Sequence, residues 1–221
     1  MDEVVTKPSA DDIRQAVAEF DSDNKILEEA LRELFGQYPH NTQPAAVLLK
    51  VTALNTLYST QIRLYSERIP TIFDVVGHIV TLGIDSDLER GNDGLVNRIS
   101  KMEIPPKVIR YNYSFATKYC SWHNPNAYPI YDSRVYAYLR HLMKHECLDR
   151  FPENDWGIYP KFKRMIKGFQ ERYGLGNFTF KEIDKFLYLQ GSMLLGRKEN
   201  KKTESIEAEP DLVPMPDEPA E

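Results

Sequence analysis

Apolar residues recur every three to four positions along most of this chain, which is the period of an amphipathic helix. The first such run follows Ser9, and Asp12 three positions later completes a capping-box pattern that marks a helix start. Gly36 and Gly83 are typical of helix ends. The pattern predicts helices over residues 9–20, 24–36, 44–58, 69–83, 84–102, 105–123, 132–148, 159–174 and 178–196.

Two of these segments contain interruptions. Gly91 and Gly94 divide the segment 84–102, and we expect a break near Asn112 in the segment 105–123. Alternating strand patterns are nearly absent, and short β-type runs such as FTF are isolated. The sequence therefore predicts an all-α fold of about eight or nine helices.

The two ends differ from the middle of the chain in composition. Residues 199–221 contain eight acidic residues and four prolines but no aromatic ring, so they cannot bury enough area to offset chain entropy. We expect one helical domain over residues 1–198 and a disordered acidic tail over residues 199–221. Residues 25–198 hold 24 basic and 18 acidic residues, a net charge of +6 that permits a polyanionic partner without requiring one.

Several classes of protein do not fit this composition. The sequence contains no run of about 18 apolar residues, which is the length needed to span a membrane. Its acidic start also lacks the apolar stretch of a signal peptide. Cys120 and Cys147 are too few for a disulfide framework or an iron–sulfur cluster and are expected to be reduced thiols. We therefore expect a cytoplasmic protein that has no membrane partner.

A metal site is the first candidate for chemistry. Cys120 and His123 are three positions apart, and His141 and His145 are four apart with Cys147 beyond them. A histidine pair at that spacing can chelate zinc, but the overall spacing fits no zinc-finger pattern. Neighbouring Arg140 and Lys144 would also repel a cation, so we expect neither a metal nor another cofactor.

Asp132 is the second candidate. It follows the apolar run AYPIY and precedes the helical pattern SRVYAYL, so it is well placed as an N-cap whose carboxylate accepts the free N–H groups of the first turn. Hydrogen bonds of that kind also favour the ionised carboxyl group. A fixed carboxylate beside an aromatic-rich loop could stabilise a cation or orient a water molecule, so capping and catalysis are compatible.

The segments SFATKYC and PIYDSRV resemble the core of the helix-hairpin-helix DNA glycosylase superfamily, in which a hairpin is followed by a catalytic aspartate that caps the next helix. The resemblance implies that Asp132 is catalytic and that Lys118 occupies the position of the Schiff-base lysine of bifunctional members. LLKVTALNTLYSTQI is similar to the family's wedge helix and places Asn55 where an amide fills the gap left by an extruded base.

The sequence departs from the family pattern at two points. Ser114 and Ala116 stand where glycines normally let backbone N–H groups approach a DNA phosphate. Lys118 and Asp132 are 14 positions apart, which is shorter than the usual spacing. A group of small bacterial and phage-associated proteins is more similar to this chain than the superfamily as a whole, through the segments SFATKYCSWHNPNAYPIYDS and FKEIDKFL. This resemblance suggests a divergent branch that includes anti-phage enzymes acting on hypermodified bases.

The resemblance implies a fold of two lobes around a cleft and an enzyme that flips a modified base out of double-stranded DNA, including phage DNA, and excises it hydrolytically. Asp132 would stabilise the oxocarbenium ion and direct a water molecule. The enzyme is expected to be a monofunctional monomer that needs no cofactor. The base pocket is expected to contain Trp122, His123, Tyr128 and Tyr131, and the DNA contacts Asn55, Tyr58, Ser114 and Arg134.

Three alternatives stay open at this stage. The missing hairpin glycines favour a non-catalytic DNA-binding or regulatory protein on the same scaffold. His123, His141 and His145 could instead serve a helical toxin or nuclease. Aromatic rings at helical spacing are also more often part of a core than of a pocket.

Overall fold

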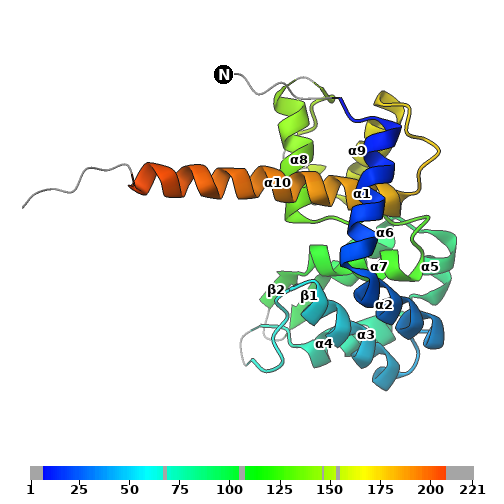
Figure 1. Ribbon diagram of the computed structural model, residues 1–221. Helices are drawn as coiled ribbons and strands as arrows, with labels where there is room; N and C mark the ends of the chain where they lie inside the picture. Colours follow the sequence, from blue (N-terminus) through cyan, green and yellow to red (C-terminus); the bar gives the residue numbers. More distant parts are fainter. Residues whose placement is uncertain (1–6, 67–68, 105–107, 146, 153–154, 208–221) are drawn as a thin grey trace, which may run out of the picture.

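The computed structural model describes residues 7–66, 69–104, 108–145, 147–152 and 155–207. Within these ranges the chain is mostly helical, as the sequence predicts (Figure 1). The helices are α1 (Ala10–Asp23), α2 (Lys25–Gln37), α3 (Pro44–Leu57), α4 (Ile72–Leu82), α5 (Asp85–Arg90), α6 (Gly94–Ser100), α7 (Tyr113–His123), α8 (Ser133–Lys144), α9 (Tyr159–Arg172) and α10 (Phe180–Glu207).

Local capping explains several of the helix ends. The predicted box at the start of α1 is present, because Ser9 accepts from the Asp12 N–H while the Asp12 side chain accepts from the Ser9 N–H. Thr71 and Asp74 form the same box at the start of α4, and Gly83 ends that helix in the left-handed region with φ of 59°. Gly36 lies inside α2 rather than ending it, since the helix continues to Gln37.

The helices form two groups, which match the predicted lobes. α1, α8, α9 and α10 lie in the upper group of Figure 1, and α2 to α7 lie in the lower group. α10 packs most extensively on α8 and also contacts α1, while α3 packs on α4 and α6 on α7. α1 leads into α2 through Asn24, which ends one helix and starts the next, so the chain crosses directly from one group to the other.

One small sheet departs from the sequence prediction of a helix over residues 105–123. β1 (Lys101–Ile104) pairs antiparallel with β2 (Val108–Tyr111), with Lys101 opposite Tyr111. The period in β1 is two, because Met102 is buried whereas Lys101 and Glu103 form an ion pair of 2.7 Å on the other face. Four-residue strands are too short for this alternation to stand out in the sequence, and only the part from Tyr113 onward is helical.

The last helix also differs from the prediction. α10 continues to Glu207, so the expected boundary between domain and tail at residue 198 falls inside this helix. Residues 208–221 of the predicted acidic tail lie outside the described residues. None of the helices that the structure describes combines the length and the apolar character needed to cross a membrane.

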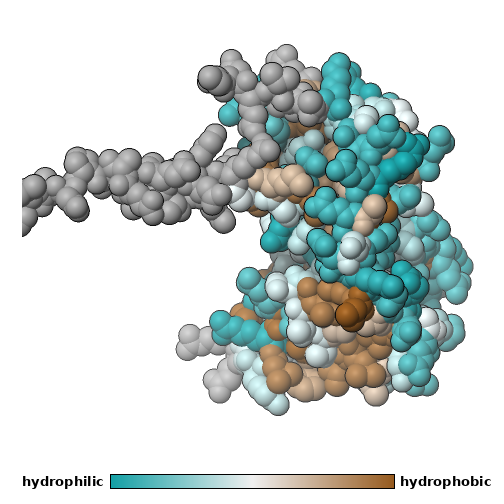
Figure 2. All heavy atoms as spheres, in the orientation of Figure 1, coloured by the Kyte–Doolittle hydropathy of each residue, from teal (hydrophilic) through white to brown (hydrophobic). Residues whose placement is uncertain are grey.

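The surface of the lower group is more apolar than that of the upper group on the face shown in Figure 2. Exposed apolar side chains of the lower group come from α2, α3, α4, the connection that precedes α4 and β2, and include Ile26, Leu49, Leu57, Tyr65, Phe73, Ile109 and Tyr111. Singly exposed apolar residues are common on protein surfaces, so this distribution alone assigns no function.

Candidate functional site

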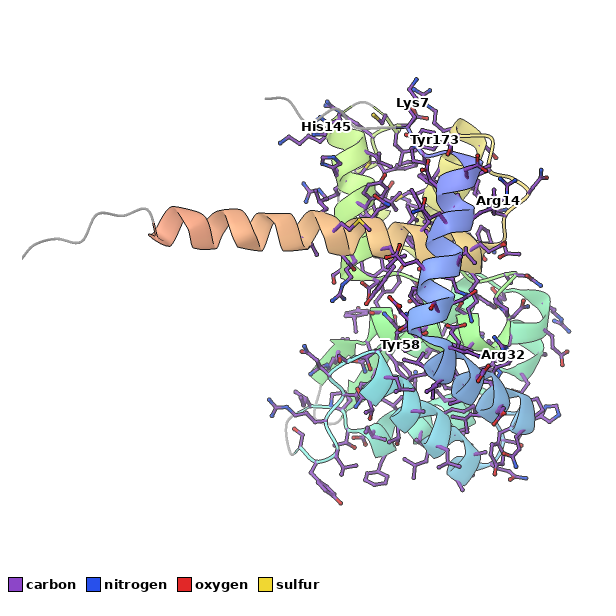
Figure 3. All side chains as sticks on the ribbon, in the orientation of Figure 1. Lys7, Arg14, Arg32, Tyr58, His145 and Tyr173 are labelled. Carbon is purple, nitrogen blue, oxygen red and sulfur yellow. The ribbon has the colours of Figure 1, made fainter. Side chains whose placement is uncertain are left out.

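A cleft of about 980 Å³ lies between the two groups of helices. Its lining comes from α1, α2, α3, α5, α7 and α10, together with the start of α8. Figure 3 places Tyr58, which lines the cleft, on the edge of the lower group that faces α10. The volume lies at the upper end of the range of about 300–1,000 Å³ that is typical of small-molecule sites. Of the residues predicted for the site, Tyr58, Lys118, Trp122, His123, Asp132 and Arg134 line this cleft.

Lys118 and Asp132 meet in the cleft despite the short segment between them. The Nζ atom of Lys118 lies 3.2 Å from Oδ2 of Asp132 and 2.6 Å from Oγ of Ser114. It also lies 3.4 Å from the carbonyl oxygen of Tyr131. Lys118 projects from α7 and Asp132 caps α8, so the ion pair joins the two helices.

Lys118 is buried, which is unusual for a lysine. Its side chain is only 2% exposed, against 16% for Asp132. Burial lowers the pKa of the Lys118 ammonium group, and the carboxylate of Asp132 opposes that change. The ammonium group of Lys118 therefore loses its proton more easily in this site than in water.

Asp132 is the N-cap of α8, as the sequence predicts. Its Oδ1 accepts a hydrogen bond of 2.9 Å from the backbone N–H of Arg134. Its Oδ2 faces Lys118, so the two carboxylate oxygens have separate partners. The guanidinium of Arg134 lies 3.9 Å from Oδ1 and 5.0 Å from the ring centroid of Tyr188. These contacts hold the carboxylate in one orientation at the edge of the cleft.

An aromatic and ionic cluster forms another part of the lining. The indole Nε1–H of Trp122 donates to the hydroxyl of Tyr58 over 3.1 Å. The Nζ atom of Lys181 lies 3.9 Å from the ring centroid of Trp122 and 2.5 Å from Oε2 of the buried Glu28. A cation therefore covers the indole face to which a flat aromatic ligand could stack.

Asp184 is a site residue that the sequence interpretation missed. It lines the cleft from α10, and its Oδ1 is shielded from solvent without a hydrogen-bond partner among the described residues. Burial raises the pKa of this carboxyl group to about 7, although the positive charge of Lys118 opposes the shift and Asp132 adds to it. Asp132 and Asp184 therefore face the same lysine from different environments.

His123 belongs to a hydrogen-bond network at another part of the cleft. Nζ of the fully buried Lys50 donates to the carbonyl oxygens of Tyr38 and His40 and to Oδ1 of Asn41 over 2.6 Å, and it lies 3.3 Å from Nε2 of His123. Burial and, to a lesser extent, the positive charge of the nearby Lys50 lower the pKa of His123 to about 3. The imidazole is thus a neutral acceptor that helps join α7 to α3.

Two predicted pocket residues, Tyr128 and Tyr131, do not line the cleft. Tyr128 is fully buried, and its hydroxyl donates to the carbonyl oxygens of Asp87 and Asn92. The ring of Tyr131 packs 5.1 Å from Tyr113 and 5.4 Å from Phe162, measured between centroids. Tyr128 is thus a core residue and Tyr131 is half-buried against the core, so their predicted contact with a base stays a prediction that the cleft lining does not support.

Asn55 and Ser114 were predicted to contact DNA. Their side chains form hydrogen bonds within the protein, and neither residue belongs to the cleft lining. The amide of Asn55 donates to the Ile62 carbonyl over 2.9 Å and accepts from the Ile62 N–H over 2.8 Å and the Thr60 hydroxyl over 2.9 Å. It thereby holds the turn after α3, where Ser59 and Gln61 have positive φ. Ser114 accepts its hydrogen bond from Lys118.

The described residues include no group of three or more His, Cys, Asp or Glu side chains that could hold a metal ion. The rings of His141 and His145 lie with centroids 4.5 Å apart and are tilted by 54°, and Figure 3 shows His145 at the end of α8 far from Tyr58. Cys120 is buried, which raises the pKa of its thiol. The histidines of the proposed nuclease alternative are therefore separated, because His123 is in the cleft while His145 is remote from it.

The missed residues have a signal in the sequence that is visible in retrospect. Lys181, Asp184, Lys185 and Tyr188 recur at three- and four-residue spacing in FKEIDKFLYLQ, which places them on one face of α10. Lys50 likewise stands alone in the apolar run PAAVLLKVTALNTL. These patterns identify polar positions in a buried setting, but they do not identify the partners that those positions meet.

Comparisons with known proteins give a family and one relative. The family model HI_0787_N, described as an N-terminal domain, matches residues 12–127. A protein of Haemophilus influenzae named as uncharacterized is 38% identical over 137 residues, which cover 62% of this chain and 65% of the relative. The match thus spans less than two thirds of that relative's length. No solved structure matches the chain.

Proposed function

We propose that this chain, which belongs to the HI_0787_N family, is a DNA glycosylase that excises a modified base by hydrolysis. The observation that carries the proposal is the ion pair between Lys118 and the helix-capping Asp132 in a cleft that Trp122 and Tyr58 also line. The matched segment of the family model ends before Asp132, so the proposal depends on the site geometry and on the resemblance of SFATKYC and PIYDSRV to glycosylase segments.

The proposed reaction uses Asp132 as the charged group. Cleavage of an N-glycosidic bond develops positive charge on the sugar, and a positioned carboxylate stabilises that charge without reorganising at the moment of reaction. The hydrogen bond from the Arg134 N–H and the contact with Lys118 hold the carboxylate in place. Asp132 also directs the attacking water molecule to the anomeric carbon.

The substrate is proposed to be a flipped base from double-stranded DNA, because a base within a duplex cannot reach a cleft between two lobes. The indole of Trp122 would stack on the base after Lys181 leaves the ring face. Arg134, whose side chain is 43% exposed beside Asp132, would contact a phosphate. The volume of about 980 Å³ leaves room for a base with a large substituent, such as a hypermodified phage base.

The decisive experiment incubates the protein with ordinary DNA and with hypermodified phage DNA and labels abasic sites through their aldehydes. The wild-type protein should create labelled sites, and Asp132→Asn should reduce their rate of formation by about 100-fold or more. Asparagine can still cap α8 through its side-chain oxygen, so the variant tests the charge. Asp149→Asn, at an exposed position outside the cleft lining, should behave like the wild type.

Two outcomes would contradict the proposal. The absence of labelled sites on every DNA would exclude base excision, and full activity in Asp132→Asn would exclude the assigned role of the carboxylate. Binding to modified DNA without base release would instead support a non-catalytic DNA-binding protein on this scaffold.

A further inference from the structure

Asp184 is a second carboxyl group in the cleft, and its surroundings differ from those of Asp132. Asp132 accepts a hydrogen bond from a backbone N–H and forms an ion pair with Lys118. Asp184 lines the same cleft, but its shielded Oδ1 has no hydrogen-bond partner among the described residues. A carboxyl oxygen that is removed from water without a replacement partner favours the protonated form of the group.

The charged and titratable groups around Asp184 come from five elements. They are Lys118 on α7, Asp132 at the start of α8, Lys181 on α10 itself, Glu28 on α2 and Tyr58, the residue that follows α3. Glu28 is paired with Lys181 at 2.5 Å, and Asp132 with Lys118 at 3.2 Å. Both nearby lysines therefore have a carboxylate partner of their own, which leaves Asp184 as the carboxyl group of this cluster without a short ion pair among the described residues.

We propose that Asp184 is the general acid that protonates the departing base, while Asp132 stabilises the sugar cation and accepts the proton of the attacking water. This inference rests on the proposed glycosylase function and adds a catalytic residue to it. A pair of carboxyl groups in unlike environments, one protonated and one ionised, is the arrangement that acid-assisted cleavage of a glycosidic bond requires.

The proposed step balances in atoms and charge. The water oxygen bonds to the anomeric carbon while the bond from that carbon to the base nitrogen breaks, and the bonding electrons stay with the base. The carboxyl proton of Asp184 moves to the base, and a proton of the water moves to Asp132. Asp184 then carries the negative charge and Asp132 the proton, and exchange with solvent restores both groups.

Burial raises the pKa of Asp184 to about 7, with Lys118 opposing the shift, so a neutral solution contains both forms of the acid. The rate of base release by the wild type should then fall as the pH rises above about 7, because the proton donor is lost. Asp184→Asn keeps the shape of the side chain but has no acidic proton. General acid catalysis contributes about 100- to 10,000-fold, so the variant should lose at least 100-fold in rate and should lose this pH dependence as well.

The test measures single-turnover base release between pH 5.5 and pH 9 for the wild type, Asp184→Asn, Asp132→Asn and a matched control, Glu171→Gln, which changes an exposed carboxylate on α9. The DNA is the one from which the wild type releases a base. Support requires the alkaline decline in the wild type and its loss, together with the loss of rate, in Asp184→Asn, while Glu171→Gln matches the wild type.

Each alternative result has a separate meaning. If the wild type releases a base and Asp132→Asn does not, but Asp184→Asn keeps the wild-type rate or pH profile, the general acid assignment is overturned and the glycosylase function stands. A wild-type profile without an alkaline decline also overturns the assignment, even if Asp184→Asn does not fold. If the wild type releases no base from any DNA, the proposed function and this inference both fail.

Discussion

The ammonium group of Lys118 lies 3.2 Å from the carboxylate of Asp132, in a position where the lysine side chain is 2% exposed. The two residues are 14 positions apart in the sequence and belong to different helices. Removal of one member of a buried pair leaves the other charge without compensation, at a cost of about 3–5 kcal/mol. The orientation of Asp132 therefore depends on Lys118 as well as on the cap of α8.

This dependence predicts the behaviour of Lys118→Met. The variant should lower base release by about 100-fold or more, because Asp132 loses the ammonium group that holds its carboxylate in place. A loss of that size corresponds to about 3 kcal/mol in the activation free energy. Lys167→Met, at an exposed position on α9, is the control. Borohydride added during turnover should trap no covalent complex with DNA if water is the nucleophile. A trapped complex that Lys118→Met abolishes would instead identify the lysine as the nucleophile.

The close approach of α10 to α8 at Gly191 predicts that the packing of these two helices affects the site. A Cβ atom at this position would lie 2.5 Å from the carbonyl carbon of Arg134 and 2.9 Å from its Cα, both of which are backbone atoms of α8. Gly191→Ala should therefore separate α10 from the start of α8, lower the free energy of unfolding by about 1–3 kcal/mol and reduce base release. Urea denaturation measures the first effect.

Gly196→Ala is the matched control on the same helix, because a Cβ there meets nothing within 4 Å. Alanine favours a helix over glycine by up to about 1 kcal/mol, so this variant should be as stable as the wild type or slightly more stable. Equal stability of Gly191→Ala and Gly196→Ala would show that the close approach to α8 has no energetic consequence.

The hydrogen bonds of Asn55 predict that this residue stabilises the fold, whereas the sequence resemblance implies a direct role in DNA binding. Asn55→Ala leaves the N–H and carbonyl groups of Ile62 without their partner, which should cost about 1–3 kcal/mol in the free energy of unfolding. Thermal and urea denaturation would measure this loss, with the exposed neighbour Thr56→Ala as control. An Asn55→Ala protein of wild-type stability that fails to release bases would favour the wedge role instead.

His123 predicts how stability depends on acid. Burial holds the pKa of the folded protein's His123 at about 3, below the ordinary value of 6.5, so between these values the unfolded chain binds more protons than the folded protein. The free energy of unfolding should therefore fall as the pH drops from 6.5 to 3, with a slope from this residue of up to about 1.4 kcal/mol per pH unit.

His123→Gln should flatten that dependence, because glutamine does not titrate. Urea denaturation at a series of pH values from 3 to 7 would measure the slope, and the exposed His145→Gln should leave it unchanged. An identical slope in the wild type and in His123→Gln would mean that the imidazole is protonated without difficulty in the folded protein.

The sequence by itself determined the helical class of the fold and several helix ends. The box of Ser9 and Asp12, the helix end at Gly83 and the cap formed by Asp132 were all predicted correctly. Each depends on contacts between residues a few positions apart, so the local sequence contains the whole interaction. The hairpin of β1 and β2 was missed because its strands are short and their pairing is an interaction between segments.

The tertiary structure decided which residues form the candidate site. It brought Lys118 to Asp132, added Asp184 from α10, and placed Tyr128 in the core and Tyr131 against the core rather than in the cleft lining. A single charged residue in an apolar run indicates that its side chain needs a polar partner. Its degree of burial and the identity of that partner depend on how helices that are far apart in the sequence pack together. The physical reason is that the ionisation of Asp184 and Lys118 is set by solvent exclusion and by charges on other helices, which no local pattern specifies.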